Sequence, residues 1–286
     1  MQVAFSLIVP TYGRTDDLAM LFSTLNRQLQ HQLEVIVVDQ NDDDRVAPYL
    51  GLLSPDIRVH HVRVRKKSLS NARNVGMAEA SGEIIAFPDD DCWYPDGLLS
   101  RVAIWFATHP GYDILAVGAQ DEEGLPSGNR WPQDQCDIRP YNSLRTTFSN
   151  SLFLKRASLP RRVVFDEKML ASEETDYILH LLTLGLRGRF DRSLHICHPR
   201  RDMLSGTISS ARAKRYGQGM GQLARRHSLY ALWAGLMAYE VFRAAIVALS
   251  GDLHGAKFCL AHAQGIVFGF LSPAPCPAST GSLQAE

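Results

Sequence analysis

Three consecutive aspartates follow a short apolar run in the first third of the chain. Asp89, Asp90 and Asp91 come directly after Glu83–Pro88, whose sequence EIIAFP is typical of a buried strand. Adjacent carboxylates repel one another, and a bound cation compensates that repulsion. Hard divalent ions such as Mg²⁺ and Mn²⁺ take carboxylate oxygens and commonly share a site with phosphate groups. The triplet therefore predicts a metal site able to neutralise a diphosphate leaving group, and the alternative is a solvated acidic turn.

Alternating strands and helices would position these aspartates. Apolar runs predict strands at Val3–Pro10, Leu33–Asp39, Ile57–Val64 and Glu83–Pro88. Helices are expected at Thr15–Gln28, Pro48–Leu53, Ser70–Ala80 and Pro95–Thr108. This alternation favours an α/β fold with a mostly parallel sheet and flanking helices. Ligands of such sheets bind beyond the carboxyl ends of the strands, where Asp39 and the aspartate triplet would lie.

Two further residues in this region have side chains suited to binding a nucleotide. Asp39 ends its strand, and its carboxylate could accept hydrogen bonds from a base or a ribose; the alternative is a turn or cap residue. Arg73 lies in the first turn of the helix that contains the sequence SNARNVG. It could pair with phosphate or with the aspartate triplet, and the alternative is an ordinary surface salt bridge.

A second acidic group opens a helix expected at Ser172–Leu184. Glu173 and Glu174 stand in its first turn, where acids commonly stabilise the helix dipole. The functional interpretation makes one of them a general base aimed at an acceptor hydroxyl. His198 follows a short strand-like segment, Leu194–Cys197. It is interpreted either as a metal or phosphate ligand or as a structural residue.

The rest of the middle is less regular. Gln120–Tyr141, rich in Gly, Pro and charge, predicts a long surface loop, and Thr146–Leu154 predicts another strand. The five cysteines form no C-x-x-C pair, which argues against a disulfide framework or a structural zinc site. The N-terminus lacks the pattern of a signal peptide, so we expect a cytoplasmic protein. The formal net charge is zero, and no nucleic-acid partner is expected.

The last third of the chain is basic and then strongly apolar. Residues 200–286 carry nine Lys/Arg and four Asp/Glu, whereas residues 1–199 carry 21 and 26. A helix is expected at Ile208–His227, followed by apolar segments at Leu229–Leu249 and Ala256–Phe270. Because Glu240 and Arg243 would be costly inside a bilayer, we expect Leu229–Leu249 to lie in the membrane interface; a core or dimer helix is the alternative. The basic residues before it would face anionic lipid: Arg200, Arg201, Arg212, Lys214, Arg215, Arg225 and Arg226.

The order of five segments resembles that of the inverting family 2 glycosyltransferases with the GT-A fold. The segments are Ile8–Arg14, Val35–Asp39, Ala72–Gly76, Asp89–Asp91 and Ser172–Asp176. In that order, they are similar to the first strand and nucleotide loop, the second strand with its base-contacting Asp, the A-R-N-x-G helix, the D-x-D metal motif and the G-E-D-x-D segment. The resemblance covers roughly residues 4–200. The run Tyr216–Gly221 (YGQGMG) is similar to a segment of bacterial polysaccharide-assembly members.

The resemblance implies a role for each matching residue. Glu174 would be the base, although the family usually has Asp there, and Glu173 is its rival. The implied metal ligands are Asp91, Asp89 and His198. The implied nucleotide-sugar-binding residues are Pro10, Thr11, Tyr12, Arg14, Asp39, Arg73, Asp89 and Asp90.

The implied function is a metal-dependent transfer of a sugar, with inversion, from a nucleotide-diphosphate donor to an acceptor hydroxyl. The expected donor is a UDP-sugar, the cofactor is Mn²⁺ or Mg²⁺, and the acceptor is lipid-linked or a polysaccharide at the inner membrane surface. A sugar nucleotidyltransferase and a non-catalytic nucleotide-sugar-binding module are the alternatives. The expected domains are residues 1–205 (GT-A, catalytic), 206–272 (a C-terminal helical appendage, membrane-associated in the preferred reading) and 273–286 (a disordered tail).

Overall fold

The computed structural model describes residues 4–28, 32–127, 131–199 and 209–272. The chain divides into two compact units. The first comprises Met1–Phe165 and His180–Arg200, and the second comprises Asp166–Leu179 and Arg201–Glu286. The domain boundary expected at residue 205, Arg200, Arg201 and the expected tail 273–286 all lie outside the described residues. The boundaries expected from the sequence therefore stay predictions.

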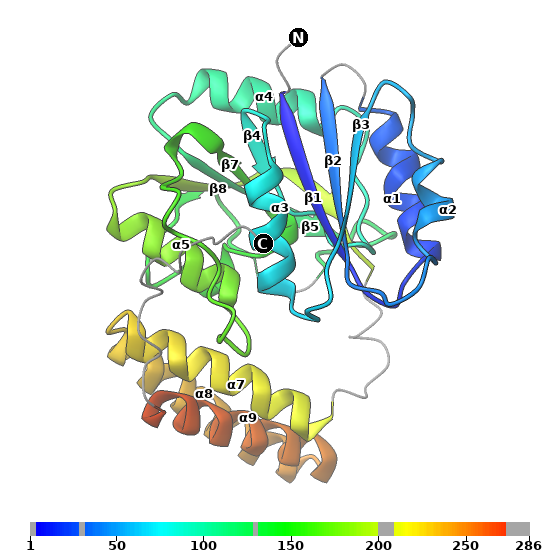
Figure 1. Cartoon of the computed structure of the whole chain (residues 1–286). Helices are drawn as coiled ribbons and strands as arrows, with labels where there is room; N and C mark the ends of the chain where they lie inside the picture. The colour runs from blue at the N-terminus through cyan, green and yellow to red at the C-terminus, as the bar shows by residue number, and fades with distance from the viewer. Residues whose placement is uncertain (1–3, 29–31, 128–130, 200–208, 273–286) are drawn as a thin grey trace. The chain divides into compact units, whose positions relative to one another are not determined.

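The first unit is built on one eight-stranded sheet, shown in Figure 1. Its strands are β1 (Phe5–Thr11), β2 (Leu33–Asp39), β3 (Arg58–Arg63), β4 (Ile84–Ala86), β5 (Ile114–Gln120), β6 (Cys136–Asp137), β7 (Leu152–Lys155) and β8 (Gly188–Cys197). Their order in the sheet is β3-β2-β1-β4-β7-β5-β8-β6. Strands β1 to β4 pair in parallel, as do β5 and β8, whereas β7 is antiparallel to both of its neighbours and β6 is antiparallel to β8. The predicted α/β class with a mostly parallel sheet is confirmed.

Helices flank this sheet. The α-helices are α1 (Asp16–Asn26), α2 (Ala47–Leu50), α3 (Leu69–Glu79) and α4 (Leu98–Thr108), and short 3₁₀ turns occur at Ser143–Arg145, Ser149–Ser151 and Arg156–Ser158. A further helix, α5 (Glu173–Thr183), is divided between the units, with Glu173–Leu179 in the second. Helix α3 packs on β1 and β2, and α4 contacts β8. A Cβ at Gly76 in α3 would overlap the Ile8 side chain, so this position requires glycine for the close approach of helix and strand.

The two central strands contain a buried polar network. Every residue of β1 and β2 is buried, including Ser6 and Glu34. The Glu34 carboxylate accepts hydrogen bonds from the Ser6 hydroxyl and from the backbone N–H groups of Ser81 (2.6 Å) and Gly82 (3.2 Å). Burial raises the pKa of Glu34, but these hydrogen bonds outweigh it and hold the pKa below its usual value. The carboxylate thereby fastens the turn before β4 to β1 and β2.

The structure differs from the sequence-based expectations in the middle of the chain. Strand β5 was not expected, because its run of apolar residues has no flanking pattern that separates a strand from a short buried helix. Gln120–Tyr141 contains β6 and buries Trp131 and Ile138, so it is only partly a surface loop. Strand β8 begins at Gly188 and includes the expected Leu194–Cys197. The described cysteines are free thiols.

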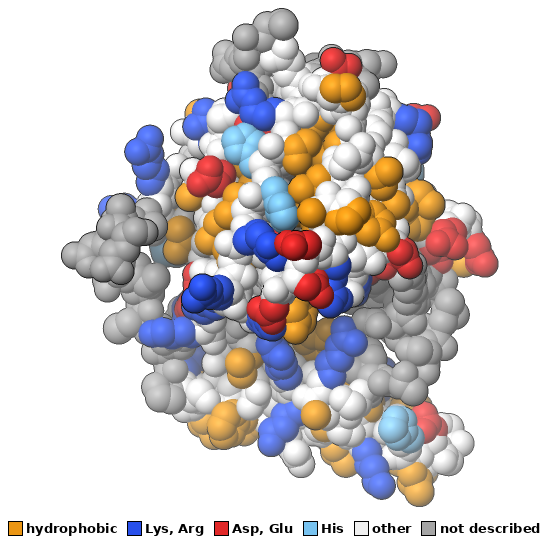
Figure 2. All heavy atoms as spheres, turned by 45° about the vertical axis from the view of Figure 1, so that its right-hand side comes forward, with side chains coloured by type: hydrophobic (Ala, Val, Ile, Leu, Met, Phe, Trp, Pro, Cys, Tyr) orange, Lys and Arg blue, Asp and Glu red, His pale blue; other side chains and the backbone are white. Residues whose placement is uncertain are grey.

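Three long helices make up most of the second unit: α7 (Ser210–Arg226), α8 (Tyr230–Leu249) and α9 (Leu253–Leu271). Helix α9 contacts both α7 and α8. On the face visible in Figure 2, these helices carry mostly hydrophobic and basic side chains. Among the described residues, only α8 is long and apolar enough to cross a membrane, by length and composition alone.

We predict that Glu34→Ala lowers the free energy of unfolding by about 2–4 kcal/mol at pH 7, because it leaves buried N–H and O–H donors without an acceptor. Since the pKa of Glu34 is lowered in the folded chain, its contribution is present at neutral pH and is lost as the pH falls through that lowered pKa. The difference between wild type and variant should therefore shrink with acidification. Urea unfolding at pH 7 and at successively lower pH measures both effects, and a difference that is independent of pH would contradict the assignment.

Candidate functional site

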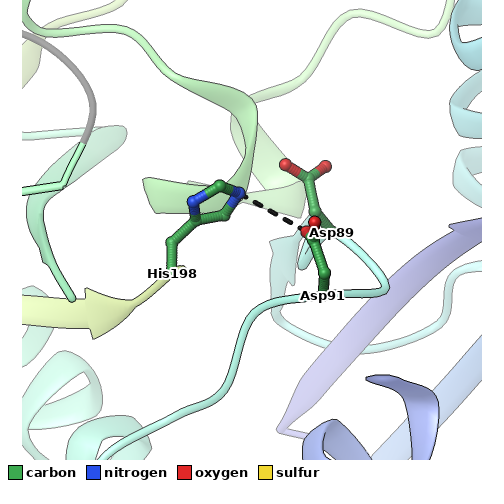
Figure 3. A group of neighbouring side chains, drawn as sticks. All are labelled: Asp89, Asp91 and His198. Atoms are coloured by element: carbon green, nitrogen blue, oxygen red, sulfur yellow. Dashed lines mark ion pairs between the residues drawn. The ribbon is translucent and has the colours of Figure 1, made fainter. Parts of the chain in front are cut away.

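A backbone bridge between two distant segments assembles the three residues expected as metal ligands. Trp93 and Cys197 exchange two backbone hydrogen bonds of 2.9 Å, which bring the loop after β4 against the end of β8. Asp89, Asp91 and His198 meet there, and their nearest ligand atoms all lie within 4.8 Å of one another. Figure 3 shows the imidazole of His198 directed at Asp91, with Asp89 beside it. The structure thus brings together the three residues expected as metal ligands.

Asp90 and Asp91 are held by the loop that follows β1. Arg14 Nη1 lies 2.7 Å from Asp90 Oδ1 and 2.7 Å from Asp91 Oδ2. Thr11, the last residue of β1, donates its hydroxyl to Asp90 at 2.9 Å. Because Asp90 is buried and already has these two partners, its carboxylate fixes the loop at the end of β1.

Asp89 has a different set of partners. Arg73 Nη2 lies 3.7 Å from its Oδ1, and the side-chain amide of Asn150 donates to its Oδ2 at 3.0 Å. Arg73 is only 1% exposed and also donates to Ser149 at 2.6 Å. A surface salt bridge, the alternative considered for Arg73, is therefore excluded. Its buried guanidinium supplies fixed positive charge beside the carboxylates.

The electrostatics of the group reflect burial and pairing. Burial raises the pKa of Asp89, and the charge of Arg73 opposes this only in part. For Asp91 and His198, burial acts against the charged forms, but their mutual interaction outweighs it. The pKa of Asp91 is therefore lowered and that of His198 is raised. His198 Nε2 lies 3.4 Å from Asp91 Oδ1, and in its protonated form the imidazole neutralises part of the acidic charge.

Asp39 lies at the carboxyl end of β2, where β1 and β3 also end. It is fully buried; its Oδ1 accepts hydrogen bonds from the backbone and side chain of Asn41, and its Oδ2 lies 3.0 Å from His61 Nε2. Asn41 in turn accepts the backbone N–H of Gly13 at 2.8 Å. The ring of Tyr12 beside this loop is 55% exposed. Lys67 Nζ lies 5.2 Å from the centroid of this ring, so the arrangement places a partly exposed aromatic ring and a cation next to fixed polar groups.

Glu173 and Glu174 form the first turn of α5 and belong to the second unit. This turn is tied to the end of α7 through Asp176. Arg226 Nη1 donates to Asp176 at 2.6 Å, His227 Nε2 lies 2.9 Å from the same carboxylate, and Arg226 Nη2 donates to Asp166 at 2.5 Å. Asp176 is buried, so these contacts fix the turn that carries both glutamates.

The donor set fits a divalent cation. Two carboxylates and one imidazole converge, and they can present oxygen and nitrogen ligands to Mn²⁺ or, with the carboxylates alone, to Mg²⁺. Sequence reasoning missed Asn41, His61, Ser149 and Asn150. Asn150 precedes the antiparallel strand β7, and nothing in the local sequence indicates that this strand lies beside β4.

A family model described as "Glycosyl transferase family 2" matches residues 6–162. A dolichol-phosphate mannosyltransferase of Pyrococcus furiosus is 33% identical over 129 residues, 44% of this chain and 36% of that protein. A Campylobacter jejuni protein named GalNAc(5)-diNAcBac-PP-undecaprenol beta-1,3-glucosyltransferase is 27% identical over 181 residues, 60% of this chain and 58% of that protein. The matched regions thus cover 36% and 58% of the length of these two curated relatives.

Solved structures share the fold. A mannosyltransferase from Pyrobaculum calidifontis in complex with GDP-Man and Mn²⁺ superposes with a TM-score of 0.64 at 18% identity, covering 94% of this chain and 88% of that chain. Staphylococcus aureus TarS 1–349 in complex with UDP-GlcNAc gives 0.60 at 16% identity, covering 92% of each chain. At this identity the likeness shows the fold, which is of the GT-A type.

We predict that Asp91→Ala weakens Mn²⁺ binding by more than about tenfold, because even residues that merely support metal ligands commonly change affinity that much. Asp96→Ala is the matched control, since Asp96 pairs with Arg27 and its side chain is 74% exposed. Calorimetric titration of the purified chain with MnCl₂ measures the affinity, and circular dichroism verifies folding. Equal Mn²⁺ affinity in the two variants would refute the ligand assignment.

Proposed function

Because the chain belongs to glycosyl transferase family 2, we propose that it is an inverting glycosyltransferase that moves a sugar from a nucleotide-diphosphate donor to an acceptor hydroxyl. The observation that carries this proposal is the convergence of Asp89, Asp91 and His198 at the carboxyl ends of the strands. Donors with charged phosphates bind at this edge of an α/β sheet. The buried Arg73 beside the group adds positive charge where a diphosphate would develop negative charge.

The residues of the first unit would bind and orient the donor. The exposed ring of Tyr12 and the end of β1, with Pro10 and Thr11, are suited to hold the base and ribose together with Asp39. Asp89, Asp91 and His198 would hold a divalent cation, which supplies Lewis-acid stabilisation of the leaving diphosphate when bound. Because an imidazole joins the two carboxylates, the set favours Mn²⁺ over Mg²⁺. Arg14 would keep Asp90 and Asp91 in place.

A glutamate in the first turn of α5 would take the proton of the acceptor. We assign this role to Glu174, with Glu173 as the rival, on the resemblance of Ser172–Asp176 to the family segment that holds the base. Deprotonation makes the acceptor oxygen a better nucleophile. The oxygen then forms a bond to the anomeric carbon as the bond to the diphosphate breaks on the opposite face, and the configuration inverts.

Relatives and solved neighbours support the choice of substrates. One curated relative is named for a PP-undecaprenol-linked substrate and another for dolichol phosphate, so we assign a lipid-linked or polysaccharide acceptor to this chain. The neighbours hold GDP-Man and UDP-GlcNAc, which leaves both nucleotides as candidates, with UDP preferred. Peripheral contact with the cytoplasmic face of a membrane would bring the enzyme to such an acceptor.

The proposal predicts metal-dependent stabilisation by one nucleotide. Thermal unfolding is measured with UDP, GDP, dTDP and CMP, each with and without Mn²⁺. Binding to the native state alone stabilises it by about 2.7 kcal/mol at a ligand concentration of 100 times Kd, so the melting temperature must rise. We expect the rise with UDP and Mn²⁺ together. If no nucleotide raises the melting temperature, the proposed donor is wrong. If the rise is the same with and without Mn²⁺, the proposed metal dependence is wrong.

The assignment of the base predicts a separation of binding from transfer. Glu174→Gln should reduce transfer by about 10²–10⁴-fold, because an amide cannot take a proton, and it should retain the nucleotide-induced thermal shift. Glu173→Gln, one residue away in the same helical turn, is the matched control and should keep most of the activity. If Glu173→Gln abolished transfer while Glu174→Gln did not, Glu173 would be the base.

A further inference from the structure

Helix α8 buries a charged residue and exposes apolar ones, the reverse of a helix on the surface of a soluble domain. Its buried residues are Glu240 and Ala244, whereas large apolar side chains point outward. Phe242 is 67% exposed and Leu249 is 88% exposed. A helix that packs on an aqueous protein turns its apolar stripe inward and its charges outward. Ionisable residues of membrane helices instead face other helices, and their apolar side chains face lipid.

The buried carboxylate of α8 is paired inside the helical bundle. Glu240 is 4% exposed, and its Oε1 lies 3.2 Å from His262 Nδ1 on α9 and 3.7 Å from Arg243 Nη1. Glu240 is residue 11 of the 20 in α8, and His262 is residue 10 of the 19 in α9, so the polar contact lies at mid-length of both helices. The contact lets the hairpin of α8 and α9 present an apolar exterior without an exposed carboxylate.

Helix α9 extends the same apolar exterior and is held on its other side by α7. Leu253, Leu260, Phe268 and Leu271 are all about half or more exposed. On the opposite side, a Cβ at Gly217 or Gly221 of α7 would overlap carbonyl groups of α9, so the two backbones are in contact there. This packing uses the small residues of α9 against α7 and leaves its large apolar residues outward.

The charge of the three helices complements an anionic surface. Residues 209–272 carry seven Lys/Arg against two acidic residues, Glu240 and Asp252, and Glu240 is buried. Arg212, Lys214, Arg215 and Arg225 of α7 are exposed. Figure 2 shows basic side chains interspersed with hydrophobic ones over these helices. Basic residues next to an apolar face are the pattern of segments that bind anionic lipid headgroups.

We propose that the exterior of α8, continued by the exposed leucines and Phe268 of α9, inserts into one leaflet of an anionic phospholipid membrane. Exposed Arg243 lies in the second half of α8, where its guanidinium can reach headgroups from a helix in the interface but would be costly at the centre of a bilayer. The insertion is therefore interfacial and does not cross the membrane. The proposed membrane-binding surface is formed by helices of the second unit alone, so it is independent of the proposed sugar transfer.

Flotation of the full chain with vesicles tests the proposal. The vesicles contain phosphatidylcholine alone or phosphatidylcholine with phosphatidylglycerol. We expect binding that is stronger with phosphatidylglycerol and weaker at high salt. The double variant Phe242→Asp/Leu249→Asp should bind at least about tenfold more weakly, because two inserted apolar side chains are replaced by charges. Both positions are exposed, so the variant should fold.

Ile104→Asp is the matched control, because Ile104 is an exposed apolar residue (63%) on α4 of the first unit, and it should bind vesicles like wild type. Circular dichroism and the nucleotide-induced thermal shift report on folding and the donor site separately from lipid binding. Undiminished vesicle binding by the double variant would overturn the proposal. So would a wild-type dimer that binds no vesicles and that Phe242→Asp/Leu249→Asp converts to monomer, because a second copy would then cover this surface.

Discussion

Repulsion among three neighbouring carboxylates is the constraint on which the arrangement of the first unit depends. Asp89, Asp90 and Asp91 cannot be brought together without positive charge, and the fold supplies it from separate segments of the chain. Arg14 follows β1, Arg73 lies in α3, and His198 follows β8. Each of these basic side chains reaches the triplet because parallel strands end at the same edge of the sheet. A divalent cation would complete a neutralisation that the protein has only partly provided.

The sequence predicted the parts of the structure that depend on local patterns. Strand β2 lies at the expected Leu33–Asp39, because its apolar run is bounded by polar residues and buried on both faces. The helices α3, α7 and α8 also lie within a few residues of their expected bounds, since their periodicity and flanking residues are clear. The convergence of Asp89, Asp91 and His198 was expected through resemblance, because no spacing within the sequence brings residue 198 to residue 91.

Contacts between distant segments were beyond sequence reasoning. Strand β7 inserts antiparallel between β4 and β5, which places Asn150 beside Asp89. The partial burial of Gln120–Tyr141 follows from Trp131, which stacks on Phe190 of β8. Neither contact has a local signal, because the sequence of β7 does not indicate which strands it pairs with, and Gly, Pro and charged residues dominate Gln120–Tyr141. The burial of Glu240 and the exposure of the large apolar residues of α8 could not be predicted either, because the sequence of an apolar helix does not indicate which of its sides is covered.

The contacts of Asp176 with Arg226 and His227 join the first turn of α5 to the long helices of the second unit. The turn with Glu173 and Glu174 is fastened to α7, and α7 is in backbone contact with α9, whose neighbour is α8. The turn that carries the proposed base and the apolar exterior of α8 therefore belong to the same unit, whereas the proposed nucleotide-binding and metal-binding residues belong to the other. Under the proposed roles, substitutions in the helices would change contacts with the acceptor and leave the donor-binding residues of the first unit unchanged. With the roles divided in this way, a change of acceptor would not require a change in the donor site.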